Sequence, residues 1–323
     1  MFLCVYPGIP VCPGLNSRRD CEEVFIMKRR AVIIKDDLGV CVLPGSVSGN
    51  MSRKEHDTEK FQRFIYDFYK NCGRDLPWRR TGDPYRILVS EIMLQQTQVE
   101  RVNKKYTSFI TRFPDIQALS RANPGDVLEE WQGLGYNRRA LSLKKTAERI
   151  CDTYGGVIPE EEKDLVSLPG IGPATASSIR AFAFNKPSVF IETNIRRVFI
   201  HCFFADREGV HDSEILPLVS RTLDPVNPRE WYWALMDYGA YLGKNIPNPN
   251  KRSSHYRKQG GFEGSDRQVR GGIIRTLIKE GKMEKTELLE RISADDARGR
   301  ALIGQLEKEG FLSDDGRTVS LRK

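Results

Sequence analysis

One glutamate in the chain lies where a carboxyl group could keep its proton at neutral pH. Glu91 stands inside the apolar run LVSEIML at positions 88–94. Burial among apolar groups disfavours the charged form of a carboxyl group and so raises its pKa. A carboxyl group of this kind can act as a general acid near neutral pH. The alternative is a buried carboxylate that is paired with an arginine and does no chemistry.

A second feature is a glycine-containing turn between two predicted helices, with the sequence LPGIGP at positions 168–173. Two glycines permit a tight turn and a close approach of the backbone to another group. Pro173 suits the first position of the helix that follows. The free N–H groups at the start of a helix bind a phosphate oxygen well, and such contacts position DNA without reading its sequence. Read alone, the motif could equally be an ordinary helix–helix turn.

Helices almost throughout residues 58–247 are expected to position these features. Apolar residues recur at helical spacing at positions 61, 64, 65 and 68. Asp83 followed by Pro84 predicts the start of a helix that runs through Leu88, Ile92 and Leu94 to Val99. Further helices are expected over 126–132, 140–154, 174–184, 194–204, 213–223 and 228–242. Strand signals are scarce in this region, so the sequence predicts an all-α fold.

A smaller unit is predicted after the turn-rich stretch NIPNPN at 245–250 and the basic segment at 251–258. From residue 267 the pattern indicates three helices and then a hairpin around Asp314-Asp315-Gly316, an order that resembles a winged helix. A helical cap is the alternative. We expect an N-terminal extension over 1–50, a main domain over 51–262 and a winged-helix-like domain over 263–323. The third helix of that domain carries mixed charge and could contact DNA or another protein.

The composition favours a polyanionic partner. The 323 residues include 51 Lys and Arg against 43 Asp and Glu, which gives a net charge of +8 and points to nucleic acid before a membrane surface. No apolar run approaches the roughly 18 residues that a membrane span needs. Seven cysteines without a C-x-x-C pair indicate reduced thiols in an intracellular protein that has no zinc site. No function is assigned to residues 1–50, and translation could start at Met51.

Several further motifs occur in one order along residues 58–245. They are LPWR at 76–79, PY at 84–85, SEIMLQQTQV at 90–99, WQGLGY at 131–136, the turn at 168–172 and MDYGA at 236–240. Together they resemble the MutY-type adenine DNA glycosylases of the helix-hairpin-helix superfamily. The resemblance implies a helix-hairpin-helix glycosylase fold, in which two helical subdomains flank a cleft. It also implies excision of a flipped, mispaired base in base excision repair.

The resemblance assigns roles to individual residues. In this family the glutamate that matches Glu91 protonates the flipped adenine. Tyr136 matches the residue that inserts between bases, which helps to meet the cost of unstacking them; a core tyrosine is the alternative. Gln95 is expected one turn beyond Glu91 on the same helix face, and Gln95 and Gln96 could enter the space that the base leaves. Further DNA or base contacts are expected from Leu76, Trp78, Arg79, Leu168, Gly170, Gly172, Ala174 and Thr175, although Trp78 could be plain core.

The chain departs from the family at the residue that stabilises the sugar cation. The family carries an aspartate there, whereas this chain carries Glu192, while Asn194 does match. The charge is kept, but electrostatic stabilisation tolerates little misplacement, and the side chain is one methylene longer. Either the backbone has adjusted so that Glu192 works, or catalysis is impaired. A simple helix cap is the alternative for Glu192.

Two further departures concern the reaction type and the cofactor. Lyases of the superfamily place a lysine where this chain has Ala174, so no amine is present there to form a Schiff base. The family's iron–sulfur cluster needs cysteines after the MDYGA motif, but no cysteine follows Cys202, so we expect no cluster and no other cofactor or metal. Phosphate contacts in its place are expected from Lys251, Arg252, Arg257 and Lys258, with a solvated charge run as the alternative. The family's domain that recognises 8-oxoguanine is not recognisable.

The sequence therefore predicts a monofunctional DNA glycosylase that uses Glu91, Glu192 and Asn194. We expect it to act as a monomer on double-stranded DNA in the cytoplasm or nucleoid, with no membrane partner. Its base is expected to be adenine opposite guanine or 8-oxoguanine. One alternative is a thymine or uracil mismatch glycosylase of the same fold. Another is a non-catalytic binder of damaged or distorted DNA, although such a protein would not need Glu91, Gln95 and Asn194.

Overall fold

A computed structural model describes residues 33–36, 39–42, 54–205, 207–258 and 260–322. The expected N-terminal extension lies outside the described residues, apart from two short strands. These strands, β1 (Ile33–Asp36) and β2 (Gly39–Val42), pair in antiparallel fashion. The rest of the described chain up to residue 258 is almost entirely helical, as the sequence predicts.

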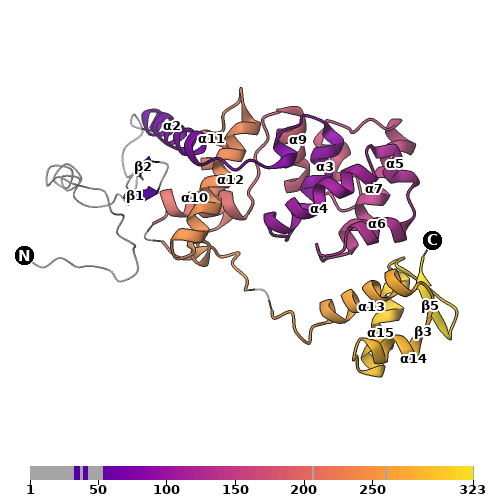
Figure 1. Ribbon diagram of the computed structural model, residues 1–323. Coiled ribbons are helices and arrows are strands. Elements are labelled where there is room, and N and C mark those ends of the chain that lie inside the picture. The colour runs from indigo at the N-terminus through magenta and orange to yellow at the C-terminus, as the bar shows by residue number, and fades with distance from the viewer. Residues whose placement is uncertain (1–32, 37–38, 43–53, 206, 259, 323) are drawn as a thin grey trace, which may run out of the picture.

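In the first group of helices, the first helix of the main unit packs against helices from its C-terminal end (Figure 1). It consists of α2 (Lys54–Cys72), α10 (Thr193–Phe203), α11 (Asp212–Thr222) and α12 (Pro228–Asn245). Aromatic side chains fill its core: the ring of Phe61 packs edge-on against Phe199 and Trp231, at centroid distances of 5.7 and 5.9 Å. Edge-to-face pairs of this kind stabilise a core beyond the area that they bury.

The second group is formed by the residues between α2 and α10 (Figure 1). It consists of the 3₁₀ turn η3 (Pro77–Arg79) and the helices α3 (Pro84–Leu94), α4 (Val99–Arg112), α5 (Ile116–Arg121), α6 (Pro124–Glu130), α7 (Arg138–Tyr154), α8 (Glu162–Val166) and α9 (Pro173–Phe184). Trp131 and Phe109 lie fully buried at its centre. The chain thus leaves the first group after α2 and returns to it at α10, so residues from both groups can meet between them.

The expected helix over 84–99 is wrong in its length. Asp83 does cap α3 by accepting the N–H of Tyr85 at 2.9 Å, but the helix ends at Leu94 and α4 begins at Val99. The guanidinium of Arg139 donates to the carbonyls of Ile92 and Met93 at 2.7 and 2.8 Å. These carbonyls are the acceptors that another helical turn would have used. Hence a contact from α7 ends the helix.

The C-terminal unit contains the three helices and the hairpin that the sequence predicts. It consists of α13 (Asp266–Glu280), β3 (Met283–Glu284), α14 (Lys285–Arg291), α15 (Asp296–Lys308), β4 (Leu312–Asp314) and β5 (Thr318–Leu321). The strands form an antiparallel sheet in the order β3-β5-β4. Ile273, Leu277, Leu306 and Phe311 are buried in its core. The domain boundaries and the winged-helix assignment stay predictions.

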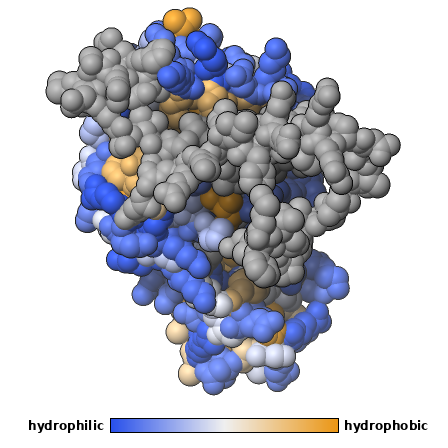
Figure 2. All heavy atoms as spheres, turned by 90° about the vertical axis from the view of Figure 1, so that its left-hand side faces the viewer, coloured by the Kyte–Doolittle hydropathy of each residue, from blue (hydrophilic) through white to orange (hydrophobic). Residues whose placement is uncertain are grey.

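The surface seen in Figure 2 is mostly hydrophilic wherever it is not grey, with smaller apolar areas between the hydrophilic side chains. Among the described residues, no helix combines the length and the apolar character that crossing a membrane requires.

Candidate active site

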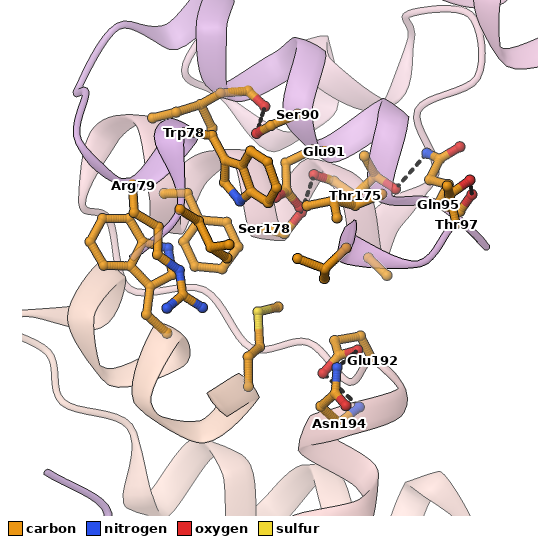
Figure 3. Close-up of a pocket in the computed structure, with 18 of the residues that line it drawn as sticks. Trp78, Arg79, Ser90, Glu91, Gln95, Thr97, Thr175, Ser178, Glu192 and Asn194 are labelled. Carbon is orange, nitrogen blue, oxygen red and sulfur yellow. Dashed lines mark hydrogen bonds between the residues drawn. The ribbon is translucent and has the colours of Figure 1, made fainter. Parts of the chain in front are cut away.

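A pocket of about 240 Å³ opens between the two helical groups. Figure 3 shows Glu91 and Ser178 on one wall, with Glu192 and Asn194 facing them across the open space. The structure therefore brings both predicted carboxylates to one site. It also places in the lining nine residues to which the sequence assigned a role: Leu76, Trp78, Arg79, Glu91, Gln95, Ala174, Thr175, Glu192 and Asn194.

Glu91 is held at the pocket by packing of α3 against α9. The hydroxyl of Ser178 donates to Glu91 Oε2 at 2.6 Å. The pKa of Glu91 is raised to about 7, mainly by burial; the Ser178 hydrogen bond opposes this rise and the nearby charge of Glu192 adds to it. Within the described residues no lysine or arginine forms an ion pair with Glu91. The carboxyl group can therefore hold a transferable proton near neutral pH, as the sequence predicts.

Glu192 both caps α10 and lines the pocket, so its role as a helix cap does not exclude a catalytic role. Its Oε1 accepts the backbone N–H groups of Asn194 and Ile195 at 2.7 and 2.8 Å. Its Oε2 accepts from Nδ2 of Asn194 at 3.2 Å. Burial raises the pKa of Glu192, while these hydrogen bonds oppose the rise. The longer side chain is thus folded back onto the start of its own helix and fixed by three donors.

Arg197 holds Asn194 in place and was missed from the sequence. It donates to Asn194 Oδ1 at 2.7 Å and to the carbonyl of Gly239 at 2.6 Å. A Cβ atom on Gly239 would lie only 2.4 Å from the carbonyl oxygen of Asn194. The glycine of the MDYGA motif therefore lets α12 approach the beginning of α10. The spacing could have predicted this contact, because side chains three residues apart on one helix are neighbours.

The residues of the LPWR motif prove to be structural as well as pocket-lining. Arg79 makes two hydrogen bonds of 2.8 Å to the buried carboxylate of Asp237, and Arg74 also pairs with Asp237. Trp78 is 5% exposed and packs edge-on against Tyr106. Since Asp237 engages the Arg79 guanidinium, this arginine shapes the pocket and places positive charge near Glu91.

The glycine turn at 168–173 is joined directly to the pocket. Gly170 has a φ of 79°, and a Cβ atom there would meet Ser142 at 2.8 Å, so this position requires glycine. Leu168 is buried, whereas Gly172 and Ala174 are exposed at the start of α9. Gln95 Nε2 donates to the Thr175 hydroxyl at 3.2 Å and to the Gly170 carbonyl at 3.4 Å. Gln95 is the C-cap of α3, and like Glu91 it lines the pocket and contacts α9, as its expected place one turn beyond Glu91 predicts.

The loop that carries Tyr136 presents this side chain outward. Tyr136 is 36% exposed and has a φ of 49°, a backbone conformation that is uncommon outside glycine. Arg139, a second residue that sequence reasoning missed, donates to the Gly135 carbonyl at 2.9 Å and to the Thr97 hydroxyl at 2.8 Å. It therefore ties the Tyr136 loop to the turn at 95–98. Tyr136 is not a core tyrosine, and Gln96 lies in that turn with a φ of 54°.

Of the four residues at 251–258 that were predicted to contact phosphates, one turns inward and three are exposed. Arg252 donates to the Phe204 carbonyl at 2.6 Å and to the Ile200 carbonyl at 3.4 Å, and so caps the end of α10. Its predicted role as a phosphate contact is wrong, because these carbonyls already engage the guanidinium. Lys251, Arg257 and Lys258 are exposed. Among the described residues, no group of three or more His, Cys, Asp or Glu is placed to hold a metal ion.

Comparison with known proteins agrees with this geometry. Residues 89–216 match the model of the family described as "HhH-GPD superfamily base excision DNA repair protein". An adenine DNA glycosylase of Mycobacterium tuberculosis is 42% identical over 262 residues, with 73% of this chain and 84% of that protein covered. An adenine DNA glycosylase of Buchnera aphidicola (subsp. Baizongia pistaciae) is 37% identical over 187 residues and covers 56% of this chain, which spans about half (52%) of its length.

The fold also has a solved relative. A thermostable thymine-DNA glycosylase superposes with a TM-score of 0.54 at 24% identity, over 62% of this chain and 94% of that one. With both helical groups, the glycine turn and the facing carboxylates in place, the chain belongs to the HhH-GPD superfamily of base excision DNA repair proteins and, within it, to the adenine DNA glycosylase family.

Proposed function

We propose that this chain is a monofunctional adenine DNA glycosylase, which hydrolyses the bond between adenine and deoxyribose at a mispair with guanine or 8-oxoguanine. The observation that carries the proposal is the pairing of two unlike carboxyl groups across one pocket. Glu91 has a pKa of about 7 and can give a proton. Glu192 is fixed by donors that favour its charged form. Two carboxyl groups in different environments divide the acid role from the electrostatic role.

The reaction follows from this division. The glycine turn and the start of α9 hold a phosphate, and the target adenine leaves the stack and enters the pocket. Glu91 gives its proton to a ring nitrogen, and the bond between that base and the sugar breaks. The Glu192 carboxylate stabilises the positive charge that develops on the sugar. Water then bonds to the sugar carbon and loses a proton to solvent, which leaves an abasic site and free adenine.

A single-turnover panel tests this function. Labelled duplexes with A opposite G, A opposite 8-oxoguanine, T opposite G and U opposite G are incubated with excess protein, with and without hot alkali afterwards. We expect alkali-labile sites only in the two adenine duplexes, and no strand breaks without alkali, because Ala174 offers no amine. Alkali-labile sites in the T or U duplexes would favour a thymine or uracil mismatch glycosylase. Binding without any alkali-labile site would favour a non-catalytic DNA-binding protein.

The proposal includes no iron–sulfur cluster. Such a cluster needs cysteine thiolates, and no cysteine follows Cys202 in the chain. The segment after α12 is held by other means: Asn250 Nδ2 donates to the Thr193 carbonyl at 2.9 Å, and Arg252 caps α10. We therefore expect purified, active protein to contain no stoichiometric iron or sulfide by elemental analysis. We also propose that the enzyme works as a monomer on double-stranded DNA, in the cytoplasm or nucleoid.

Substitution of Gly239 should disable the site from a distance. Gly239→Ala places a methyl group against Asn194, so that α12 and the start of α10 must separate. A shift of about 1 Å can cost roughly a hundredfold in rate, so we expect at least that loss in single-turnover excision, together with a lower melting temperature. Gly304→Ala is the matched control, because this helical glycine has nothing within 4 Å of its Cβ position. Wild-type excision by Gly239→Ala would contradict the role of this close approach.

A further inference from the structure

One serine on α9 contacts the acid group of the active site. Ser178 is 4% exposed and lines the reaction pocket. Its hydroxyl lies 2.6 Å from Glu91 Oε2, and Figure 3 marks this contact with a dashed line. The same hydroxyl lies 3.0 Å from the carbonyl oxygen of Thr175, three residues earlier on α9. A serine hydroxyl has a single proton to donate, so it can serve only one of these two acceptors at a time.

The choice between the two acceptors favours Glu91. A serine within a helix commonly bonds back to a carbonyl of its own helix. Ser90 on α3, which lines the same pocket, does this and donates to the Ile87 carbonyl at 2.8 Å. Ser178 has such a carbonyl within reach, yet its shorter contact is to Glu91 on another helix. Since a hydroxyl bonds more strongly to a carboxylate than to a neutral carbonyl, Ser178 donates to Glu91 whenever Glu91 is charged.

Among the described residues, three other charged side chains line the pocket, and each has a partner of its own. Arg74 and Arg79 both bind the carboxylate of Asp237. Glu192 accepts the N–H groups at the start of α10. The positive charge of Arg79 lowers the pKa of Glu91 and the negative charge of Glu192 raises it. A substitution at position 178 leaves the partners of all three in place, so its effect on Glu91 is that of the hydroxyl alone.

We propose that Ser178 is a positioning residue for the acid: by donating to Oε2 of Glu91 it leaves the acid proton on Oε1, and it stabilises the carboxylate that forms when this proton is transferred. The inference rests on the proposed function. Within the described part of the chain, Oε1 accepts no hydrogen bond, so this oxygen is left for the base. In the step itself the Oε1–H bond breaks, the proton bonds to a ring nitrogen of adenine, and the electron pair stays on Glu91.

The hydrogen bond from Ser178 gains strength as the proton leaves. Before the transfer Ser178 donates to a neutral carboxyl group, and afterwards it donates to a carboxylate, to which a hydrogen bond is roughly twice as strong. An interaction that strengthens toward the transition state raises the rate of the chemical step. If Oε2 carried the proton instead, that proton would bond to Ser178, and Ser178 would turn its own proton to the Thr175 carbonyl. No acid proton would then face the base.

A titration of Glu91 tests this role without relying on turnover. The full chain, with carbon-13 in its glutamate carboxyl groups, is titrated by NMR, and the Glu91 signal is assigned by its absence from Glu91→Gln. The hydroxyl favours the charged form of Glu91, so Ser178→Ala should move the titration midpoint upward by at least about one pH unit. Ser177→Ala is the matched control. It removes a hydroxyl from the adjacent residue of α9, which is 5% exposed and is not among the described residues that line the pocket.

The pH dependence of excision separates positioning from a merely structural role. Single-turnover excision from an A-opposite-8-oxoguanine duplex by Ser178→Ala should be about tenfold slower than wild type at pH 6. The pH above which its rate falls should be higher by the same interval as the titration midpoint. Ser178→Thr keeps a hydroxyl and should restore both properties. A loss of packing would lower the rate and the melting temperature without moving the pH at which the rate falls.

Two results would overturn the inference. One is a Ser178→Ala protein whose Glu91 titrates as in the wild type, or in which Ser177→Ala moves the midpoint equally. The other is an active Ser178→Ala protein whose rate falls at the wild-type pH. A failure of the proposed function looks different. In that case Ser178→Ala still raises the titration midpoint of Glu91, but the wild-type protein excises no base.

Discussion

Glu91→Gln should abolish adenine excision, with a single-turnover rate at least about a thousandfold below wild type. Positioned acids typically contribute between about 10² and 10⁴ to a rate, and glutamine has no proton of this kind to give. The substitution keeps an oxygen that can accept the Ser178 hydroxyl, so the packing of α3 against α9 survives. Rates are measured with excess protein on an A-opposite-8-oxoguanine duplex. An excision rate within tenfold of the wild-type rate would show that Glu91 is not the general acid.

The same group sets the pH dependence of the wild-type enzyme. Glu91 must be protonated to act, and its pKa is raised to about 7, mainly by burial. The excision rate should therefore fall about tenfold per pH unit above pH 7. Glu192 must be charged, so the rate should also fall on the acid side.

Stability provides the control for Glu91→Gln. Burial raises the folded-state pKa of Glu91 above its unfolded value. Below about pH 4.5 the group is neutral in both states, so its burial does not lower the free energy of unfolding. As the pH rises through about 7, the free energy of unfolding falls, because the unfolded state loses this proton more readily. The shift corresponds to about 3 kcal/mol. We expect Glu91→Gln to have a higher free energy of unfolding than wild type at pH 8, by up to that amount. At pH 4.5 the difference should vanish.

Glu192→Gln should lower the excision rate by about 10² to 10³, because it removes the charge that faces the sugar cation. Glutamine can still accept the N–H groups of Asn194 and Ile195, so α10 remains capped. DNA affinity should change little, which separates this effect from a loss of binding. Glu192→Asp keeps the charge and is also a good helix cap, so it should lose less activity than Glu192→Gln. Equal rates for wild type and Glu192→Gln would contradict the electrostatic role.

Local patterns in the sequence were sufficient for much of the fold. Helical spacing, the Asp83 cap and the glycine turn depend on neighbours within a few residues, and the structure confirms them. The motifs also identified both carboxyl groups and most of the pocket lining. What they could not supply were contacts between residues far apart in the chain. Arg139 ends α3 from 46 and 47 residues away, so the chain leaves the helix after Gln95 rather than continuing to Val99.

The charged residues illustrate the same limit. A basic run at 251–258 gives no sign that Arg252 turns inward to cap α10, because the carbonyls that it binds lie 48 and 52 residues earlier. Arg197 stands three residues after Asn194 in the sequence, but its hydrogen bond to the Gly239 carbonyl depends on how α12 crosses α10. The C-terminal unit was predicted from local signals, whereas its position beside Tyr136 depends on Glu309, Arg138 and Arg270.

The central claim is that this chain removes adenine by hydrolysis through Glu91, and the released base tests it most directly. Excess protein is incubated with an A-opposite-8-oxoguanine duplex at pH 7, and the small molecules are identified by mass spectrometry. The account predicts one equivalent of free adenine per duplex with wild type and none within the same time with Glu91→Gln. Release of no adenine by the wild-type protein, or equal release by Glu91→Gln, would contradict it.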